Sequence, residues 1–155
     1  MLKTVILIPA RFASTRYPGK PLVNLKGKGG TPKPLIQRSY EAACRVPGIA
    51  AVHVVTDDDR IAAAVRGFGG APLMTSEHCR NGTERCAEAL DQLDSDVDVV
   101  VNFQGDALLT PPGFVTALVD EALTLFEEHR ITTLFVIEDG RPVGVVHIHD
   151  TPASR

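Results

Sequence analysis

Residues 4–22 read TVILIPARFASTRYPGKPL, and they join an apolar run to a loop rich in proline and in cations. Residues 4–8 are almost continuously apolar, which predicts a strand covered on both faces of a parallel sheet. The loop that follows carries Arg11, Arg16 and Lys20. In open α/β sheets, ligands bind beyond the carboxyl ends of the strands. We therefore expect this loop to lie at a ligand site.

Short β-branched runs alternate with longer helical patterns in the rest of the first two thirds of the chain. The three further runs that we expect to form strands are residues 51–56, 71–75 and 97–103. The helices expected between them are residues 34–46, 58–68 and 81–93, the last from the capping-box spacing of Asn81 and Glu84. Residues 26–32, KGKGGTP, are expected to form a flexible loop without regular structure. The alternation predicts an α/β fold with a parallel sheet and right-handed crossovers.

The last quarter of the chain has a different pattern. Residues 112–130 are expected to form a long helix. The apolar residues expected on one face of this helix are Phe114, Leu118, Ala122, Leu125 and Phe126. Strands are predicted at residues 132–137 and 143–148, with a hairpin turn at Asp139-Gly140. The chain thus closes with an α-β-β segment.

Composition excludes several classes of function. The chain has 155 residues, 44% of them apolar, which suits one domain with a real core. A net charge of −3 argues against nucleic-acid binding, which usually needs a basic face, so any anion binding must be local. No apolar run approaches a membrane span, and the start leaves no room for a signal peptide. The three cysteines are expected to be reduced thiols of a cytoplasmic protein.

The cations of the opening loop suit a triphosphate. A glycine lets backbone amides approach an anion, and arginine and lysine neutralise phosphate charge. Arg11 and Lys20 are the best candidates to grip such a group, with Arg16 as a third. The loop does not match the strict P-loop spacing or the dinucleotide fingerprint. A solvated basic turn has the same composition and stays open as an alternative.

Two further segments carry candidate site residues. Gln104-Gly105-Asp106 follows an apolar strand, where a carboxylate facing a phosphate-binding loop could hold Mg²⁺. A turn aspartate that caps the next segment is the alternative. Asn81, Thr83 and Arg85 lie at a helix start, where free N–H groups favour an anion or a polar ligand. An ordinary capped helix explains that spacing equally well.

Residues 9–22, P-A-R-x-x-S-T-R-x-P-G-K-P-L, resemble the signature of the 3-deoxy-manno-octulosonate (Kdo) cytidylyltransferases, also known as CMP-Kdo synthetases. Further matching motifs follow in order: KPLIQRSYEAA, VVTDDDRI, FGG, MTSEHCRNGTER and VNFQGD. The resemblance covers about residues 1–115. The opening loop and the Gln-Gly-Asp motif are its most specific parts.

The resemblance implies a three-layer, Rossmann-like nucleotide-diphospho-sugar transferase fold. It implies Mg²⁺-dependent transfer of CMP from CTP to a Kdo-like sugar acid with release of pyrophosphate, and it allows a homodimer. The residues that it places in catalysis are Arg11, Lys20 and Asp106, with Asp106 as the metal ligand. The residues that it places around the nucleotide are Ala10, Arg11, Ser14, Gly19, Lys20, Met74, Thr75, Thr83, Arg85 and Gln104.

Two features depart from that family. Ala107-Leu108 follow the Gln-Gly-Asp motif where the family usually has Glu-Pro, and no counterpart of the family's second half is found, so we expect a truncated fold. Residues 121–150 instead resemble the end of a CBS domain, as in arabinose-5-phosphate isomerases. We therefore expect a cytidylyltransferase-like domain at residues 1–118 and a CBS-like segment at residues 119–155 that packs on it. A non-catalytic nucleotide-binding or regulatory protein is the alternative function.

Overall fold

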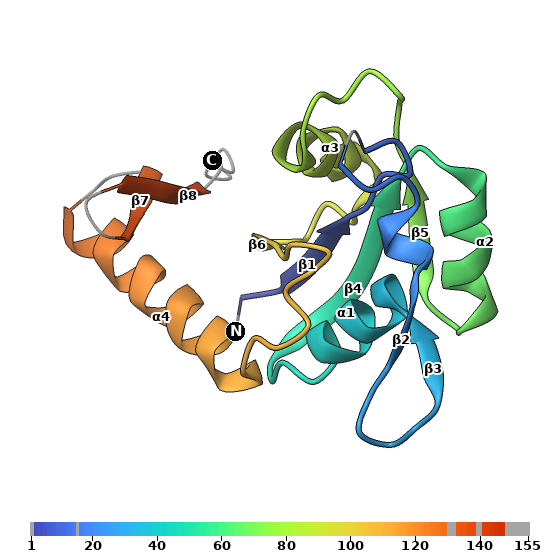
Figure 1. The fold of residues 1–155 in the computed structure, drawn as a ribbon. Coiled ribbons are helices and arrows are strands. Elements are labelled where there is room, and N and C mark those ends of the chain that lie inside the picture. The colour runs from blue at the N-terminus through green and yellow to red at the C-terminus, as the bar shows by residue number, and fades with distance from the viewer. Residues whose placement is uncertain (1, 15, 130–132, 139–140, 148–155) are drawn as a thin grey trace. The chain divides into compact units, whose positions relative to one another are not determined.

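A computed structural model describes residues 2–14, 16–129, 133–138 and 141–147 of the chain, the last two ranges by their backbone alone. The chain divides into two compact units, Met1–Pro112 and Gly113–Arg155, which are described separately below (Figure 1). The predicted domain boundary after residue 118 and the packing of one domain on the other stay predictions.

The first unit is built on a four-stranded sheet. All neighbouring strands in it are parallel, and their order is β5-β4-β1-β6. The strands are β1 (Thr4–Pro9), β4 (Ile49–Thr56), β5 (Ala71–Met74) and β6 (Val99–Asn102). The predicted parallel sheet is confirmed, although β6 is shorter at both ends than the apolar run that predicted it. The central position of β1 explains why nearly all its side chains are buried.

Three helices connect these strands. They are α1 (Leu35–Ala43), α2 (Asp59–Gly67) and α3 (Gly82–Ala89), which continues as the 3₁₀ turn η2 (Leu90–Gln92). The predicted start of α3 is confirmed, because the Asn81 side chain accepts a hydrogen bond of 2.9 Å from the Glu84 N–H. The Glu84 carboxylate accepts hydrogen bonds from the backbone N–H of Arg80 and from the side-chain amide of Asn81. The reciprocal half of the capping box is therefore shifted by one residue.

The helices cover both faces of the sheet (Figure 1). Val5 and Leu7 of β1 pack with Cys86 and Ala89 of α3, in a cluster of buried side chains. Alternate residues of a strand point to opposite faces, so Ile6 and Ile8 face the other side. Right-handed crossovers from β1 to β4 and from β4 to β5 place α1 and α2 on that second side. The three-layer α/β fold is thus confirmed.

One predicted loop contains regular structure at both ends. The 3₁₀ turn η1 (Lys20–Leu22) leads into a small antiparallel hairpin of β2 (Asn24–Lys26) and β3 (Pro32–Pro34). The expectation that residues 26–32 lack any regular element was wrong at those ends. Only the tip between the strands is a turn, closed by a hydrogen bond from the Gly30 N–H to the Gly27 carbonyl.

The α-β-β pattern predicted for the end of the chain is confirmed. It consists of helix α4 (Pro112–His129) and an antiparallel hairpin of β7 (Thr133–Glu138) and β8 (Arg141–His147). The predicted apolar face of α4 was partly wrong, because Phe114 and Leu118 are 61% and 38% exposed whereas Ala122 and Phe126 are buried. The predicted turn residues Asp139 and Gly140 lie outside the described residues. In the part of the chain that the structure describes, no helix is long and apolar enough to cross a membrane.

Candidate functional site

The loop after β1 and the turn after β6 meet at the carboxyl edge of the sheet. Strands β1 and β6 are neighbours, with Leu7 opposite Asn102. The turn after β6 is closed by a hydrogen bond of 2.9 Å from the Ala107 N–H to the Gln104 carbonyl. A Cβ atom at Gly105 would lie 3.0 Å from the Pro9 carbonyl oxygen, so the turn is pressed against the end of β1. The two motifs singled out in the sequence therefore lie side by side.

A cavity of about 290 Å³ opens between them. Five of the residues predicted to contact the nucleotide line this cavity, together with the predicted metal ligand Asp106: Ala10, Arg11, Ser14, Lys20 and Gln104. Arg16 also lines it, so all three cations of the opening loop face one space. A second cavity of about 660 Å³ shares Lys20 and Asp106 in its wall and is otherwise lined largely by apolar side chains such as Leu25 and Leu108.

The predicted phosphate-binding lysine and the predicted metal-binding carboxylate contact each other. Lys20 Nζ lies 2.7 Å from Asp106 Oδ2, and the two side chains are 49% and 60% exposed. The hydrogen bond from Lys20 holds the pKa of the Asp106 carboxyl below its ordinary value. Because both groups are accessible to solvent, the pair itself adds little to stability. Each group nevertheless compensates the charge of the other.

The opening loop is anchored on helix α2. The Arg60 guanidinium lies over the Phe12 ring, 3.3 Å from the ring centroid, and Arg60 also pairs with Asp58 at 2.6 Å. Asp58 in turn caps the start of α2. A guanidinium on an aromatic face is a favourable cation–π contact. The sequence placed Arg60 in a family motif without assigning it a role, and residues 12 and 60 are too far apart in the chain for local patterns to connect them.

Gly19 completes this anchor. Its φ of 71° lies in the left-handed region, and a Cβ atom there would lie 3.0 Å from Cε2 of Phe12. Its N–H donates a hydrogen bond of 2.9 Å to the Phe12 carbonyl. Gly19 is not among the residues that line the smaller cavity, and its contact with a nucleotide stays a prediction.

Gly19→Ala is expected to destabilise the protein more than Gly48→Ala does, because its methyl group strains the backbone and also pushes on Phe12. Strain of this kind costs about 1–3 kcal/mol. The check is the urea concentration at the midpoint of unfolding. Gly48→Ala is a matched control, since Gly48 has a φ of 78° but no atom within 4 Å of an added Cβ. If both changes lowered the midpoint equally, the role of the Phe12 contact would be refuted.

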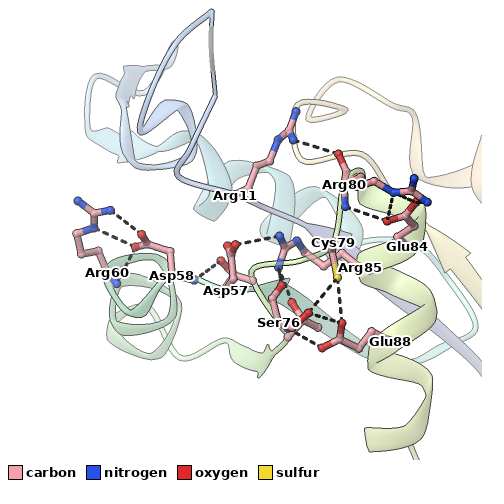
Figure 2. A network of polar contacts seen from close by, with 12 residues as sticks. Arg11, Asp57, Asp58, Arg60, Ser76, Cys79, Arg80, Glu84, Arg85 and Glu88 are labelled. Carbon is pink, nitrogen blue, oxygen red and sulfur yellow. Dashed lines mark hydrogen bonds and ion pairs between the residues drawn. The ribbon is translucent and has the colours of Figure 1, made fainter.

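A third segment, between β5 and α3, joins the site (Figure 2). Arg11 Nη1 lies 3.3 Å from the Arg80 carbonyl oxygen, which connects the opening loop to this segment. A Cβ atom at Gly82 would lie 2.9 Å from Cγ of Pro9 and 4.0 Å from Oε1 of Gln104, so the start of α3 approaches the same edge of the sheet. Thr83, the next residue, is exposed there.

Arg85 is buried behind that segment. Its side chain is 2% exposed, and Figure 2 shows it between Asp57 and Ser76. Nη1 donates to Thr75 Oγ1 at 2.6 Å and to the Ser76 carbonyl at 3.3 Å, and Nη2 pairs with Asp57 at 3.1 Å. Arg85 therefore ties the ends of β4 and β5 to α3. A direct contact of Arg85 with a nucleotide stays a prediction, and so does that of Met74, which is 37% exposed at the end of β5.

Glu88 of α3 holds the same segment from its other side. Its carboxylate accepts hydrogen bonds from the Ser76 backbone and hydroxyl and from Cys79 Sγ, the last at 3.1 Å (Figure 2). These hydrogen bonds lower the pKa of the Glu88 carboxyl, the Cys79 contact foremost. The sequence analysis gave Glu88 no role, because a carboxylate on an exposed helix face is ordinary.

The donor set of the cavity suits a magnesium ion that is bound mainly by the phosphate groups of a substrate. Asp106 supplies a carboxylate and Gln104 a side-chain carbonyl oxygen at this edge. No cluster of three or more His, Cys, Asp or Glu side chains that could hold a metal occurs among the described residues. Mg²⁺ is commonly bound through one or two carboxylates together with substrate phosphates, so one aspartate beside a phosphate-binding loop fits.

Comparison with known proteins gives one consistent result. A model of the family described as cytidylyltransferase matches residues 5–143. The mitochondrial 3-deoxy-manno-octulosonate cytidylyltransferase of Arabidopsis thaliana is 50% identical over 117 residues, which cover 76% of this chain and 39% of that protein. The 8-amino-3,8-dideoxy-manno-octulosonate cytidylyltransferase of Shewanella baltica is 44% identical over 129 residues, 83% of this chain and 49% of that protein.

Solved structures of similar fold include proteins of the same kind. CMP:2-keto-3-deoxy-manno-octonic acid synthetase complexed with CTP is 38% identical, with a TM-score of 0.73 over 86% of this chain and 51% of that one. A cytidylyltransferase from Leptospira borgpetersenii shares the fold at 23% identity and a TM-score of 0.69, over 95% of this chain and 61% of that one. The chain thus spans about half the length, or less, of the curated relatives described above.

Proposed function

The chain belongs to the cytidylyltransferase family, and on that premise we propose that it binds CTP at the carboxyl edge of its sheet and transfers CMP to a Kdo-like sugar acid. The observation that carries the proposal is the cavity in which three cations and Asp106 come together. In the reaction, a sugar hydroxyl oxygen attacks the α-phosphorus of CTP. The bond from that phosphorus to the oxygen that bridges to the β-phosphorus breaks, and pyrophosphate and a proton are released.

The charged residues of the cavity and Gln104 each have a part in this reaction. Arg11 and Lys20 bind the triphosphate and neutralise the charge that develops on the leaving pyrophosphate, with Arg16 beside them. Asp106 would hold Mg²⁺, and Gln104 lines the same cavity. Bound Mg²⁺ supplies further neutralisation of the phosphate oxygens. The remaining contribution of the protein is alignment of the hydroxyl with the α-phosphorus, for which a rigid loop is needed.

The test is a turnover assay on the full chain with CTP and Mg²⁺. Kdo and its 8-amino-8-deoxy analogue are supplied as alternative acceptors, because relatives of both names match. We expect pyrophosphate release that depends on an acceptor, with the CMP-sugar identified by mass spectrometry. If the protein bound CTP but formed no CMP-sugar with either acceptor, transfer would be contradicted and only nucleotide binding would remain.

Nucleotide binding without catalysis is the second candidate. It is favoured by Ala107, which follows Asp106 where the family usually carries a glutamate. In that case residues 121–150 would act as a CBS-like contact or sensing segment. That resemblance stays a prediction, and the cytidylyltransferase model matches as far as residue 143. Cytoplasmic location and a homodimer also stay predictions.

A further inference from the structure

Ser39 is a buried polar residue in the middle of α1. Its side chain is 0% exposed. Serine is a weaker helix former than alanine because its hydroxyl competes for backbone groups. Ser39 Oγ lies 2.6 Å from the Gly105 carbonyl oxygen and 3.2 Å from the Leu35 carbonyl oxygen, one turn back in the helix. A hydroxyl has a single hydrogen to donate, and the shorter distance assigns it to Gly105.

The carbonyl that Ser39 holds belongs to the peptide bond between Gly105 and Asp106. A peptide unit is planar, so fixing its oxygen fixes the orientation of the whole plane, and with it the direction in which the next Cα leaves the turn. On its other side, Gly105 is pressed against the Pro9 carbonyl, where an added Cβ would be only 3.0 Å away. Ser39 and Pro9 thus hold the turn from two directions.

Asp106 depends on that orientation. Its carboxylate reaches Lys20 of η1 at 2.7 Å, across the opening of the cavity. The turn itself has one internal backbone hydrogen bond, from the Ala107 N–H to the Gln104 carbonyl. Turns of types I and II share this closing hydrogen bond but differ in the orientation of the central peptide, so the bond alone does not fix that orientation. Helix α1 supplies the group that does.

We propose that Ser39 is a positioning residue whose buried hydroxyl orients the Gly105–Asp106 peptide so that the Asp106 carboxylate faces Lys20 and the cavity. It thereby sets the affinity of the site for a complex of CTP with a divalent cation. The part that concerns this complex rests on the proposed function. The part that concerns the orientation of the turn does not.

The first arm of the test needs no ligand. Hydrogen exchange of the Ala107 amide is measured by NMR in the wild type, Ser39→Ala, Ser39→Thr and Val65→Ala. Ser39→Ala is expected to speed this exchange about fivefold, the typical net contribution of one hydrogen bond. Ser39→Thr keeps the hydroxyl and is expected to exchange as the wild type does. Val65 is a fully buried residue of α2 outside both cavity linings, so Val65→Ala reports a general loss of stability.

The second arm is a double-mutant cycle read by calorimetric titration of CTP with Mg²⁺. Ser39→Ala is expected to lower the affinity about tenfold in the wild type and to have no further effect in Asp106→Asn, because Ser39 acts through Asp106. Equal losses in both backgrounds, or unchanged exchange of Ala107 in Ser39→Ala, would overturn the proposal. If the wild type bound no CTP, the proposed function would fail and the exchange arm would still decide the role of Ser39.

Discussion

Asp106→Asn is expected to change CTP affinity in opposite directions with and without magnesium. With Mg²⁺, affinity falls about 10- to 150-fold, the equivalent of losing one contact of about 1.5–3 kcal/mol to a charged group. With EDTA, affinity rises up to about fivefold. In the structure the Asp106 carboxylate pairs with Lys20 at 2.7 Å. An exposed ion pair of this kind stabilises by up to about 1 kcal/mol. Removing it frees the lysine for a phosphate and removes a repelling charge.

Lys20→Met separates this explanation from a general loss of the site. It removes a phosphate contact, so it is expected to weaken CTP binding in both conditions. Both variants are titrated calorimetrically at low ionic strength, where charge interactions are least screened. Lys33→Met is the matched control, because Lys33 pairs with Glu41 at the same 2.7 Å but lies outside both cavities. A fall in affinity for Asp106→Asn in EDTA would contradict the competition between the carboxylate and the phosphates.

Arg85→Met is expected to be the most destabilising single change outside the apolar core. It leaves Asp57 without its partner and Thr75 without a donor, in a region where the guanidinium is 2% exposed. Breaking a buried ion pair by removing one partner costs about 3–5 kcal/mol, a large share of the total stability of an ordinary domain. Urea unfolding followed by circular dichroism measures the loss. CTP affinity is expected to fall as well, because the segment between β5 and α3 loses its anchor.

Two further variants test this explanation. Arg80→Met removes an arginine that is 85% exposed, precedes α3 and pairs with Glu84 of that helix, so it is expected to cost less than about 1 kcal/mol. Arg85→Met combined with Asp57→Asn is expected to be less destabilising than the sum of the two single changes, because the buried charge disappears with its partner. Strict additivity would show that Arg85 acts through packing alone.

Most of the fold could be predicted because it depends on local patterns and on one rule of chirality. The apolar run of β1 and the cap at Asn81 are readable from neighbouring residues, and right-handed crossovers then place the helices. The hairpin of β2 and β3 was missed, because three-residue strands with prolines at both ends of β3 show no alternation. The face of α4 was partly missed, because periodicity does not distinguish two overlapping stripes such as those of Phe114 and Val115.

The location of the site could be predicted from the sequence, but its individual contacts could not. The rule that ligands bind at the carboxyl ends of strands predicts Lys20 and Asp106 at the same edge of the sheet. Their direct pairing joins residues 86 positions apart, which no spacing in the sequence reveals. The burial of Arg85 likewise depends on groups from two other elements. Ser39 lies in a quoted motif, yet its partner is a backbone carbonyl, and a carbonyl leaves no mark on the sequence.

The order β5-β4-β1-β6 makes the two edges of the sheet chemically different. Among the described strands, β5 pairs only with β4 and β6 only with β1, so each of them is an edge strand of this sheet. Strand β5 contains Pro72, which has no N–H to offer an incoming strand. Strand β6 reads VVVN and keeps every N–H. Among the described strands, β6 is therefore a more favourable edge than β5 for the pairing of a further strand.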